Sequence, residues 1–340
     1  MATTFSSLPI VDLSPLKTPR ELSTEKQREL ASQLYDVFAT TGFAYLVNHP
    51  LSFDHEALFD MSREFFALPI EEKMKLAKKS FRKDHNNTYR GYFPTQPDLA
   101  NDNLKEGFEI GPQNCIPEAS VSNDTPDTAN LPKINLSEPN IWPALAIFPS
   151  RQKLEQLHNE LQSLASTLCS LLAISLGKEA DFFSSYLTDS LSTLRLLHYP
   201  SSPCTPHTDS GILTLLHQDA TGGLEVQNSD GNWVAAPYVP GSVVVNIGDL
   251  MAKVSGGRFV ATVHRVRTPP TSASSSSSAT FPNGKEQQFA GCGRFSVPFF
   301  FEPGEKCVIK SVDDEDGADA VVYGEHVRAK MKTWVEFRDL

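Results

Sequence analysis

Residues 207–219 read His-Thr-Asp-Ser-Gly-Ile-Leu-Thr-Leu-Leu-His-Gln-Asp (HTDSGILTLLHQD), a polar His-x-Asp pair followed by a short apolar run. In an extended segment, residues i and i+2 point to the same side, so His207 and Asp209 can approach one ion. The apolar run Ile212–Leu216 has the composition of a strand. The His-x-Asp pair alone is a weak signal, because a chain of this length contains one by chance about half of the time.

Similar β-rich runs recur through the second half of the chain, separated by turn residues such as Gly222-Gly223, Asp230-Gly231 and Gly248-Asp249. Regularly spaced short strands with such breaks predict a sandwich or a barrel. The predicted runs are Thr193–Tyr199, Ile212–Leu216, Gly223–Val226, Trp233–Ala236, Ser242–Ile247, Phe259–His264 and Phe295–Phe301.

The first third of the chain predicts a mixed α/β region. Leu8–Leu13 and Phe43–Val47 have strand composition. Between them, Thr24 followed by Gln27 forms a capping-box pattern that predicts the start of a helix, and Gly42 is a natural stop. A second helix is expected from about His55 to Phe66. A basic helix is expected after Pro69, and we expect its charges to form one solvated face: Lys73, Lys75, Lys78, Lys79, Arg82 and Lys83.

Between these regions lie a polar stretch and a strongly amphipathic one. Residues 112–140 are rich in Pro, Asn, Ser and Asp, which predicts a long loop. A long packing helix follows, with leucines spaced three or four apart at positions 154, 157, 161, 164, 168 and 171. Thr271–Ala279 is a serine-rich, low-complexity stretch that predicts a surface loop. The chain closes on a predicted helix with Val327, Met331, Trp334 and Val335 on one face.

Composition narrows the function classes. The net charge of −11 and the pI of about 5.3 argue against nucleic acid or an anionic membrane as a partner. The five cysteines are odd in number and contain no C-x-x-C pair, as expected in a reducing compartment. We find no secretory signal and no run of membrane-spanning length, so a soluble cytoplasmic protein is expected.

A second histidine strengthens the metal hypothesis. His264 lies 55 residues after Asp209, beyond several predicted strands, and belongs to the β-rich run ATVHRV. Two imidazoles and one carboxylate on one face of a metal leave positions open, which suits non-haem iron(II) that activates oxygen. Zinc could occupy the same three residues.

The segment GRFSVPFFFEP favours iron. A buried Arg294 can grip a carboxylate through two parallel hydrogen bonds, and the Ser296 hydroxyl can reach the same anion. In an unbroken strand Arg294, Ser296, Phe300 and Glu302 would face the interior, while Phe295, Val297, Phe299 and Phe301 would pack against helices. Arg195 and Tyr199 are an even number of residues apart on the strand before the metal motif, so their side chains point to the same side of it. A metal ion beside the carboxylate-binding pair Arg294 and Ser296 suits a 2-oxo diacid as ligand.

These motifs resemble the isopenicillin N synthase-like branch of the iron(II)/2-oxoglutarate-dependent dioxygenase family, in look closest to fungal oxygenases of secondary metabolism. The matching pieces follow the family's order through nearly the whole chain: LPIVDL, GFAYLVNH, REFFALPIEEK, RGY, KEGFEIG, LRLLHYP, HTDSGILTLLHQD, GGLEVQ, VVNIGDLM, VHRV and GRFSVPFFFEP. The resemblance implies a double-stranded β-helix (jelly roll) flanked by helices. It implies iron(II) at His207, Asp209 and His264, and 2-oxoglutarate at Arg294 and Ser296 with Tyr199 assisting.

The resemblance also implies O2 as the oxidant and ascorbate as a stimulant. One integrated catalytic unit is expected: an α/β region at 1–120, a loop and supporting helix at 121–190, the jelly-roll core at 191–310 with an insert at about 269–290, and a helical segment at 311–340. We expect a small-molecule substrate, no nucleic acid or membrane partner, and a monomer or weak homodimer.

Three departures from the family pattern stand out. The gap from His264 to Arg294 is 30 residues, about three times the usual spacing, and holds the serine-rich stretch. Leu197 stands where plant relatives often carry Asn. His217 stands where relatives carry a residue that does not bind the metal, so it is a rival ligand, although its apolar strand argues against that role.

The substrate expected from this pattern is an aromatic or polyketide-like secondary metabolite, which would be hydroxylated or otherwise oxidised with release of succinate and CO2. Arg195, Phe300 and Glu302 are the candidate substrate contacts, and for Arg195 and Glu302 a structural ion pair or hydrogen bond is an equal alternative. Two other functions remain open at this point: an iron oxidase of the same fold that does not use 2-oxoglutarate, and a non-catalytic ligand-binding relative.

Overall fold

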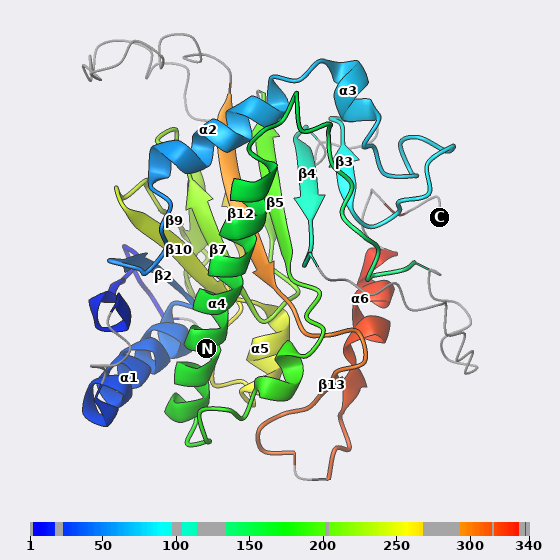
Figure 1. The fold of residues 1–340 in the computed structure, drawn as a ribbon. Helices are drawn as coiled ribbons and strands as arrows, with labels where there is room; N and C mark the ends of the chain where they lie inside the picture. Colours follow the sequence, from blue (N-terminus) through cyan, green and yellow to red (C-terminus); the bar gives the residue numbers. More distant parts are fainter. Residues whose placement is uncertain are drawn as a thin grey trace, which may run out of the picture.

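The computed structural model describes residues 3–17, 23–96, 104–113, 134–200, 204–267, 293–314, 316–332 and 337. Most strands belong to one large sheet, which is antiparallel except where β1 pairs with β2 (Figure 1). None of the helices in these residues has the length and apolar character that a membrane span needs. In spatial order the large sheet contains β1 (Ile10–Asp12), β2 (Phe43–Val47), β10 (Ser242–Ile247), β7 (Leu213–Gln218), β12 (Arg294–Phe301), β5 (Thr193–Tyr199), β4 (Glu106–Ile110) and β3 (Gly91–Phe93).

A smaller sheet holds β6 (Cys204–His207), β11 (His264–Val266), β8 (Leu224–Gln227) and β9 (Trp233–Ala235), in that order. A third, two-stranded sheet pairs β13 (Val308–Ile309) with β14 (Val321–Val322). The helices are α1 (Thr24–Thr40), α2 (His55–Phe66), α3 (Ile70–Met74), α4 (Arg151–Ser175), α5 (Asp249–Val254) and α6 (Tyr323–Met331), with short 3-10 turns at Ser14–Lys17 and Ser184–Leu187.

One face of the large sheet packs against helices. The alternation predicted for β12 is confirmed, since Phe295, Val297, Phe299 and Phe301 all lie in the main hydrophobic core. The same core contains the leucines of α4, so the long helix has the packing role expected of it. Burying these apolar side chains contributes about 25 cal/mol per Å² of area removed from water, and this holds the helices on the sheet.

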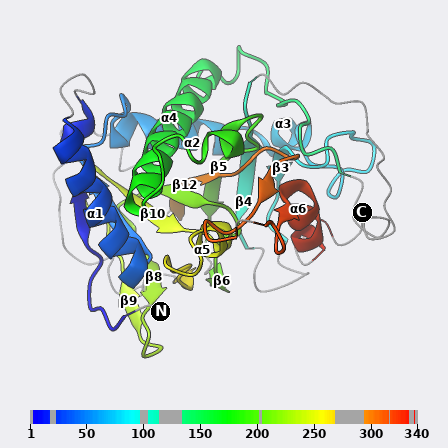
Figure 2. The same cartoon turned by 90° about the horizontal axis from the view of Figure 1, so that it is seen from below.

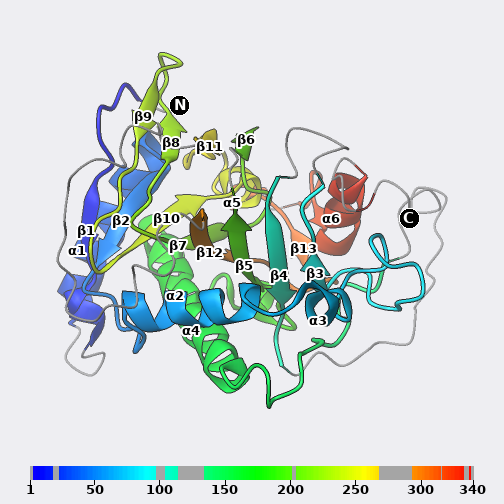
Figure 3. The same ribbon diagram turned by 90° about the horizontal axis from the view of Figure 1, so that it is seen from above.

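The other face of the large sheet meets the small sheet. Phe43, Tyr45 and Val244 of the large sheet form a second apolar cluster with Leu224 and Val226 of β8. Figures 2 and 3 show the small sheet on one side of the large sheet and α2 and α4 on the other. The result is the jelly-roll core with flanking helices that the sequence predicted.

Most predicted elements are confirmed, including the helix that opens at Thr24, and three details are wrong. The capping residue of α1 is Ser23, whose hydroxyl accepts from the Lys26 N–H, and not Thr24 as the capping-box pattern predicted. Asp249, predicted in a turn, begins α5. Within the predicted strand Phe259–His264, only His264 is in a strand. The residues before His264 contact the end of α1 instead, where the Val260 N–H donates to the Phe38 carbonyl.

Gly42 lies where the end of α1 meets the segment that precedes His264, and the chain needs glycine at this position. Its φ is +70°, and a Cβ there would collide with the carbonyl oxygen of Val260. Such a close approach is possible only without a side chain. Gly42 therefore both follows the end of α1, as predicted, and lets the segment before His264 pack closely.

The prediction of one solvated basic helix is wrong. Helix α3 has five residues, and Lys73 and Lys78 are only 7% and 2% exposed. Lys73 forms an ion pair with Glu106 and Lys78 with Glu109. These glutamates lie three residues apart on β4, so they face opposite sides of the sheet. A charge run that looked solvated in sequence therefore supplies two buried cations.

Several sequence predictions fall partly or wholly outside the described residues. The serine-rich stretch 271–279 and the surrounding insert 269–290 lie outside them, as do residues 114–133 of the predicted loop and Trp334 and Val335 of the last helix. In α6, Val327 and Met331 are buried as predicted. Strands β3, β4 and β6 were not predicted, because they are short and lack a clear alternation of apolar residues.

Candidate metal centre and adjoining residues

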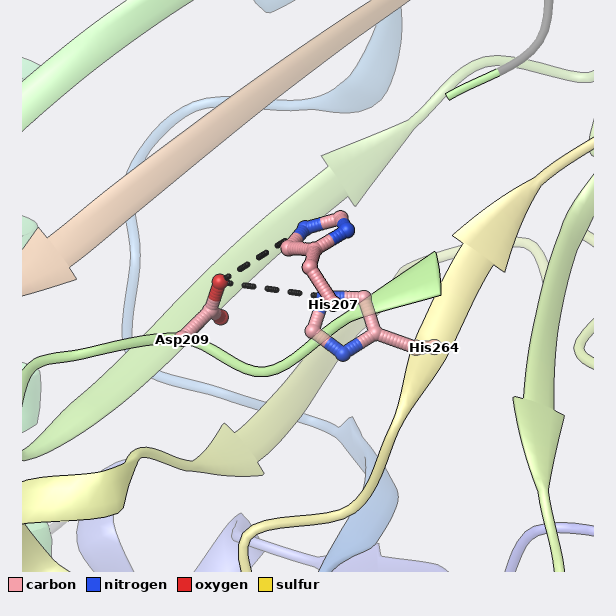
Figure 4. A group of neighbouring side chains, drawn as sticks. All are labelled: His207, Asp209 and His264. Carbon is pink, nitrogen blue, oxygen red and sulfur yellow. Dashed lines mark ion pairs between the residues drawn. The ribbon is translucent and has the colours of Figure 1, made fainter. Parts of the chain in front are cut away.

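Three side chains meet at one end of the space between the two sheets. His207 ends β6 and His264 begins β11, and the two residues are direct partners in the small sheet. Asp209 follows two residues after His207, as expected for side chains on the same side of an extended segment. Its Oδ1 lies 4.0 Å from His207 Nε2 and 3.7 Å from His264 Nε2 (Figure 4).

Backbone carbonyls fix the orientation of both imidazoles. His207 Nδ1 lies 2.8 Å from the Thr205 carbonyl oxygen, and His264 Nδ1 lies 3.2 Å from that of Thr262. A carbonyl only accepts, so in each ring Nδ1 carries a proton, and Nε2 is the nitrogen that remains for a metal ion. Burial lowers the pKa of His264, which favours the neutral, coordinating form. Both Nε2 atoms therefore point at the Asp209 carboxylate as potential ligands.

The second carboxylate oxygen of Asp209 is held by two side chains of the large sheet. Thr214 Oγ1 donates to Oδ2 over 2.6 Å, and Asn246 Nδ2 donates over 2.8 Å. These bonds leave Oδ1 facing the imidazoles. Burial opposes ionisation of Asp209, but His264, His207 and the two hydrogen bonds together lower its pKa. Sequence reasoning missed Thr214 and Asn246, although a lone amide in the apolar strand VVVNI was a usable signal.

The arrangement fits a divalent metal ion. The candidate ligand atoms of His207, Asp209 and His264 all lie within 4.8 Å of one another. Two imidazoles and one carboxylate are the donor set of non-haem iron(II) sites with open positions. His207 is 41% exposed, whereas Asp209 and His264 are buried, so the site opens to solvent on the His207 side.

His217 lies away from this centre. It belongs to the same face of β7 as Leu213 and Leu215, which pack in the helix-side core, and its ring contacts that of His49. Burial lowers its pKa to about 3. The expectation that His217 is no part of the metal group agrees with this position on the opposite face of the sheet.

Arg294 and Ser296 lie together on the face of β12 that looks toward the small sheet. Arg294 is 4% exposed, and its Nε donates to the Gly222 carbonyl over 2.7 Å. Its Nη1 donates to Ser296 Oγ over 3.1 Å. Nη2 is buried and has no hydrogen-bond acceptor among the described residues. A buried guanidinium nitrogen without an acceptor is costly unless an anion binds there, so the pair fits a ligand carboxylate.

Tyr199 completes this corner. It pairs with Arg294 across β5 and β12, and the Arg294 Cζ lies 5.0 Å from the centre of the tyrosine ring. Leu197, two residues earlier on the same face, packs with Tyr199 and Phe93. The position where plant relatives often carry Asn is therefore part of an apolar wall in this chain.

The three candidate substrate contacts differ in their surroundings. Arg195 forms an ion pair with Glu109, and its guanidinium lies 5.0 Å from the centre of the Phe300 ring. Glu302 is 5% exposed and accepts from the Tyr323 hydroxyl over 2.7 Å and from Thr193 over 3.3 Å. Glu302 is thus buried, whereas Arg195 and Phe300 are partly exposed.

Comparison with known proteins identifies two family signatures in the chain. Residues 190–303 match the 2OG-Fe(II) oxygenase superfamily. Residues 8–145 match the N-terminal region described as non-haem dioxygenase in morphine synthesis. The first match contains the three candidate metal ligands as well as Arg294 and Ser296.

Individual relatives agree with these signatures. The chain is 31% identical to a 2-oxoglutarate-Fe(II) type oxidoreductase of Emericella nidulans, over 86% of this chain and 78% of the relative. It is 34% identical to a 2-oxoglutarate-dependent dioxygenase of Didymella fabae, over 78% of this chain and 81% of the relative. Among solved structures, a full-length Neurospora crassa protein in complex with alpha-KG and 5-formyluracil matches with a TM-score of 0.73, 26% identity and 96% coverage of both chains.

Proposed function

Because the chain belongs to the 2OG-Fe(II) oxygenase superfamily and is therefore an enzyme that uses iron(II), 2-oxoglutarate and O2, we propose that it hydroxylates or otherwise oxidises a small aromatic or polyketide-like secondary metabolite. In the bound enzyme, iron(II) with 2-oxoglutarate supplies O2 activation coupled to the release of succinate and CO2. The protein must hold these reactants, keep the target C–H bond close to them and exclude water.

The metal ligands in this proposal are His207, Asp209 and His264. The support is their mutual geometry together with the carbonyl contacts that engage Nδ1 of each ring and leave Nε2 for the metal. Thr214 and Asn246 act through Asp209, because they hold its Oδ2 and so orient Oδ1. Outer hydrogen bonds of this kind tune metal affinity in proteins.

The 2-oxoglutarate clamp in this proposal is Arg294 and Ser296, with Tyr199 packed beside the guanidinium. The observation that carries the assignment is the buried Nη2 of Arg294, which has no acceptor within the described part of the chain. A carboxylate placed between Nη2 and the Ser296 hydroxyl would accept from both. Arg294 is fixed in advance by its bond to the Gly222 carbonyl, so little side-chain entropy is lost on binding.

The substrate contacts in this proposal are Phe300 and Arg195. Glu302 is buried and would act only through its neighbours. Phe300 lies directly opposite Thr214 in the sheet, and Thr214 hydrogen-bonds Asp209. A molecule resting on the Phe300 ring would therefore lie next to the metal ligands. The names of the relatives do not fix the substrate, since they include both a homoarginine-6-hydroxylase of Arabidopsis thaliana and a clavatol oxidase of Penicillium crustosum.

The test measures succinate release from 2-oxoglutarate, with iron content measured on the same samples. The parent protein should bind about one iron and form succinate in the presence of O2, and the rate should rise with the true substrate. His264→Ala should lose both iron and turnover, whereas the matched variant His217→Ala should keep iron. Oxygen consumption without succinate would show an oxidase of another type, and an iron-loaded protein with neither activity would contradict catalysis.

A further inference from the structure

Arg195 lies in a slot between two aromatic rings. Its guanidinium carbon is 5.6 Å from the centre of the Phe93 ring and 5.0 Å from that of Phe300. These rings come from β3 and β12, which are separated in the large sheet by β4 and β5. The Arg195 side chain is 23% exposed, so solvent and small molecules can reach it. Phe300 is also partly exposed, whereas Phe93 is fully buried, so the accessible part of this slot consists of Arg195 and one face of Phe300.

The carboxylate that holds Arg195 is shared with another cation. Glu109 forms ion pairs with both Arg195 and Lys78, and the side chains of Glu109 and Lys78 are only 3% and 2% exposed. Burial opposes ionisation of Glu109, but Arg195 and Lys78 lower its pKa, which favours the carboxylate form. This group of three residues therefore carries two positive charges and one negative charge, and Arg195 is its solvent-facing member.

Two further charged side chains lie near Arg195: Arg90, a cation, and Glu302, a carboxylic acid whose ionisation is disfavoured. Arg90 is fully buried and donates to the Leu191 carbonyl over 2.8 Å. Burial raises the pKa of Glu302, which favours its uncharged form. Even if Glu302 is counted as an anion, three cations (Arg195, Lys78 and Arg90) outnumber two carboxylates (Glu109 and Glu302), so this group carries a net positive charge. A guanidinium has several N–H donors in a fork, so Arg195 can bind an acidic group while it keeps its other contacts.

The slot is close to the metal centre and distinct from the co-substrate clamp. Phe300 is the cross-strand neighbour of Thr214, which hydrogen-bonds the metal-site residue Asp209. Arg294 lies six residues before Phe300 on the same strand, which corresponds to roughly 20 Å along the strand. A carboxylate at Arg195 would therefore not compete with one at Arg294.

We propose that the substrate of this enzyme carries a carboxylate on a flat apolar body, and that Arg195 binds this carboxylate while the partly exposed Phe300 contacts the body and the buried Phe93 supports Arg195 from its other side. The inference rests on the proposed function, since it names the substrate class of the same site. It also adds Phe93, Glu109 and Lys78, which sequence reasoning did not single out as substrate-site residues. Lys78 and Glu109 are positioning residues, because they act on the substrate only through Arg195.

The experiment compares two probes of equal size, 2-naphthoate and its uncharged amide 2-naphthamide. Binding is measured by calorimetry without oxygen, with iron(II) present and with saturating 2-oxoglutarate so that the clamp at Arg294 is filled. We expect the parent protein to bind the acid about 10- to 100-fold more tightly than the amide. Arg195→Met preserves much of the side-chain length and should reduce acid binding to the level of the amide. Arg195→Lys should give an intermediate preference.

Arg151→Met is the matched control. Arg151 also pairs with a glutamate and lies 5.1 Å from the centre of an aromatic ring, Trp142, but it belongs to α4 on the helix side of the sheet. Its substitution should leave the preference for the acid unchanged. Equal binding of acid and amide by the parent, an acid preference that survives in Arg195→Met, or no binding of either probe at millimolar concentration would overturn the proposal.

Separate readouts distinguish this inference from the proposed function. Iron content and 2-oxoglutarate affinity are measured on the same Arg195 variants, and both should equal those of the parent. If the parent binds iron and 2-oxoglutarate but does not distinguish acid from amide, the substrate class is wrong and the reaction class stands. If acid preference depends on Arg195 but no succinate forms with any substrate, the proposed function fails instead.

Discussion

The hydroxyl of Thr214 donates a 2.6 Å hydrogen bond to Oδ2 of Asp209. Thr214 belongs to β7 of the large sheet, whereas the imidazoles that approach the other oxygen of Asp209 belong to the small sheet. The carboxylate therefore links the two sheets at the metal centre, and its orientation depends on the way they pack.

Thr214→Val keeps the shape of the side chain and removes this hydrogen bond. Because Asp209 would then be free to turn, we expect iron affinity to fall about 10- to 100-fold with the fold intact. Iron competition with a chelator measures the change. Thr167→Val, on an exposed position of α4, is the control and should have no effect. Unchanged iron affinity in Thr214→Val would show that Asn246 alone orients the carboxylate.

Arg294→Ala should raise the 2-oxoglutarate requirement steeply. The loss of a charge-assisted, two-point contact costs about 2–4 kcal/mol, or a factor of roughly 30 to 1,000 in affinity. The dissociation constant of 2-oxoglutarate, measured on the iron-loaded protein, checks this. Circular dichroism establishes that the variant is folded. If the variant binds 2-oxoglutarate as tightly as the parent, the clamp lies elsewhere.

Phe300→Ala should separate 2-oxoglutarate consumption from product formation. Without the ring, the target C–H bond is no longer held in place, so succinate should still form while the yield of oxidised product per succinate decreases. Iron and 2-oxoglutarate binding should remain those of the parent. Measuring succinate and product in the same reaction gives the ratio. An unchanged ratio with unchanged substrate affinity would mean that Phe300 only packs in the protein interior.

The buried and exposed lysines of the basic segment should differ in their effect on stability. Lys78→Met leaves Glu109 buried with less compensating charge, and we expect a loss of about 3–5 kcal/mol in the free energy of unfolding. Lys75→Met breaks a surface pair with Glu72, in which the lysine is 61% exposed, and should cost less than about 1 kcal/mol. Urea denaturation of both variants tests the difference. Equal losses would contradict the buried role of Lys78.

Two buried histidines should make the fold sensitive to acid. Burial lowers the pKa of His158 to about 4 and that of His217 to about 3. In the unfolded chain both would titrate near the ordinary value of about 6.5, so the unfolded state binds protons first as the pH falls. Their contribution is therefore fully present above about pH 6.5 and decreases below it, by at most about 1.4 kcal/mol per pH unit for each histidine.

Unfolding free energies of the parent and of the double variant His158→Asn/His217→Gln, measured between pH 7 and pH 5, test this prediction. The double variant is expected to be less stable at pH 7, because both sites are tightly packed, but to lose less stability on acidification. Parallel pH profiles for the two proteins would show that neither histidine is the acid-sensitive group.

The sequence alone determined the layered fold and the central site. The strict alternation in GRFSVPFFF predicted which side chains of β12 face the helices, because neighbouring residues on a strand point to opposite faces. His207 and Asp209 were predictable for the same reason, since residues two apart share a side. The pairing of His264 with them needed only the order of family motifs along the chain.

Other features depended on contacts between residues far apart in the sequence, which no local pattern encodes. Lys73 and Lys78 looked like parts of a solvated face until β4 placed a glutamate against each of them. Only the packing of the two sheets showed that Thr214 holds Asp209. In the same way, only the tertiary structure showed that Phe93 of β3 and Phe300 of β12 flank Arg195. Burial and partner choice are properties of the assembled sheets, so the tertiary structure alone decided them.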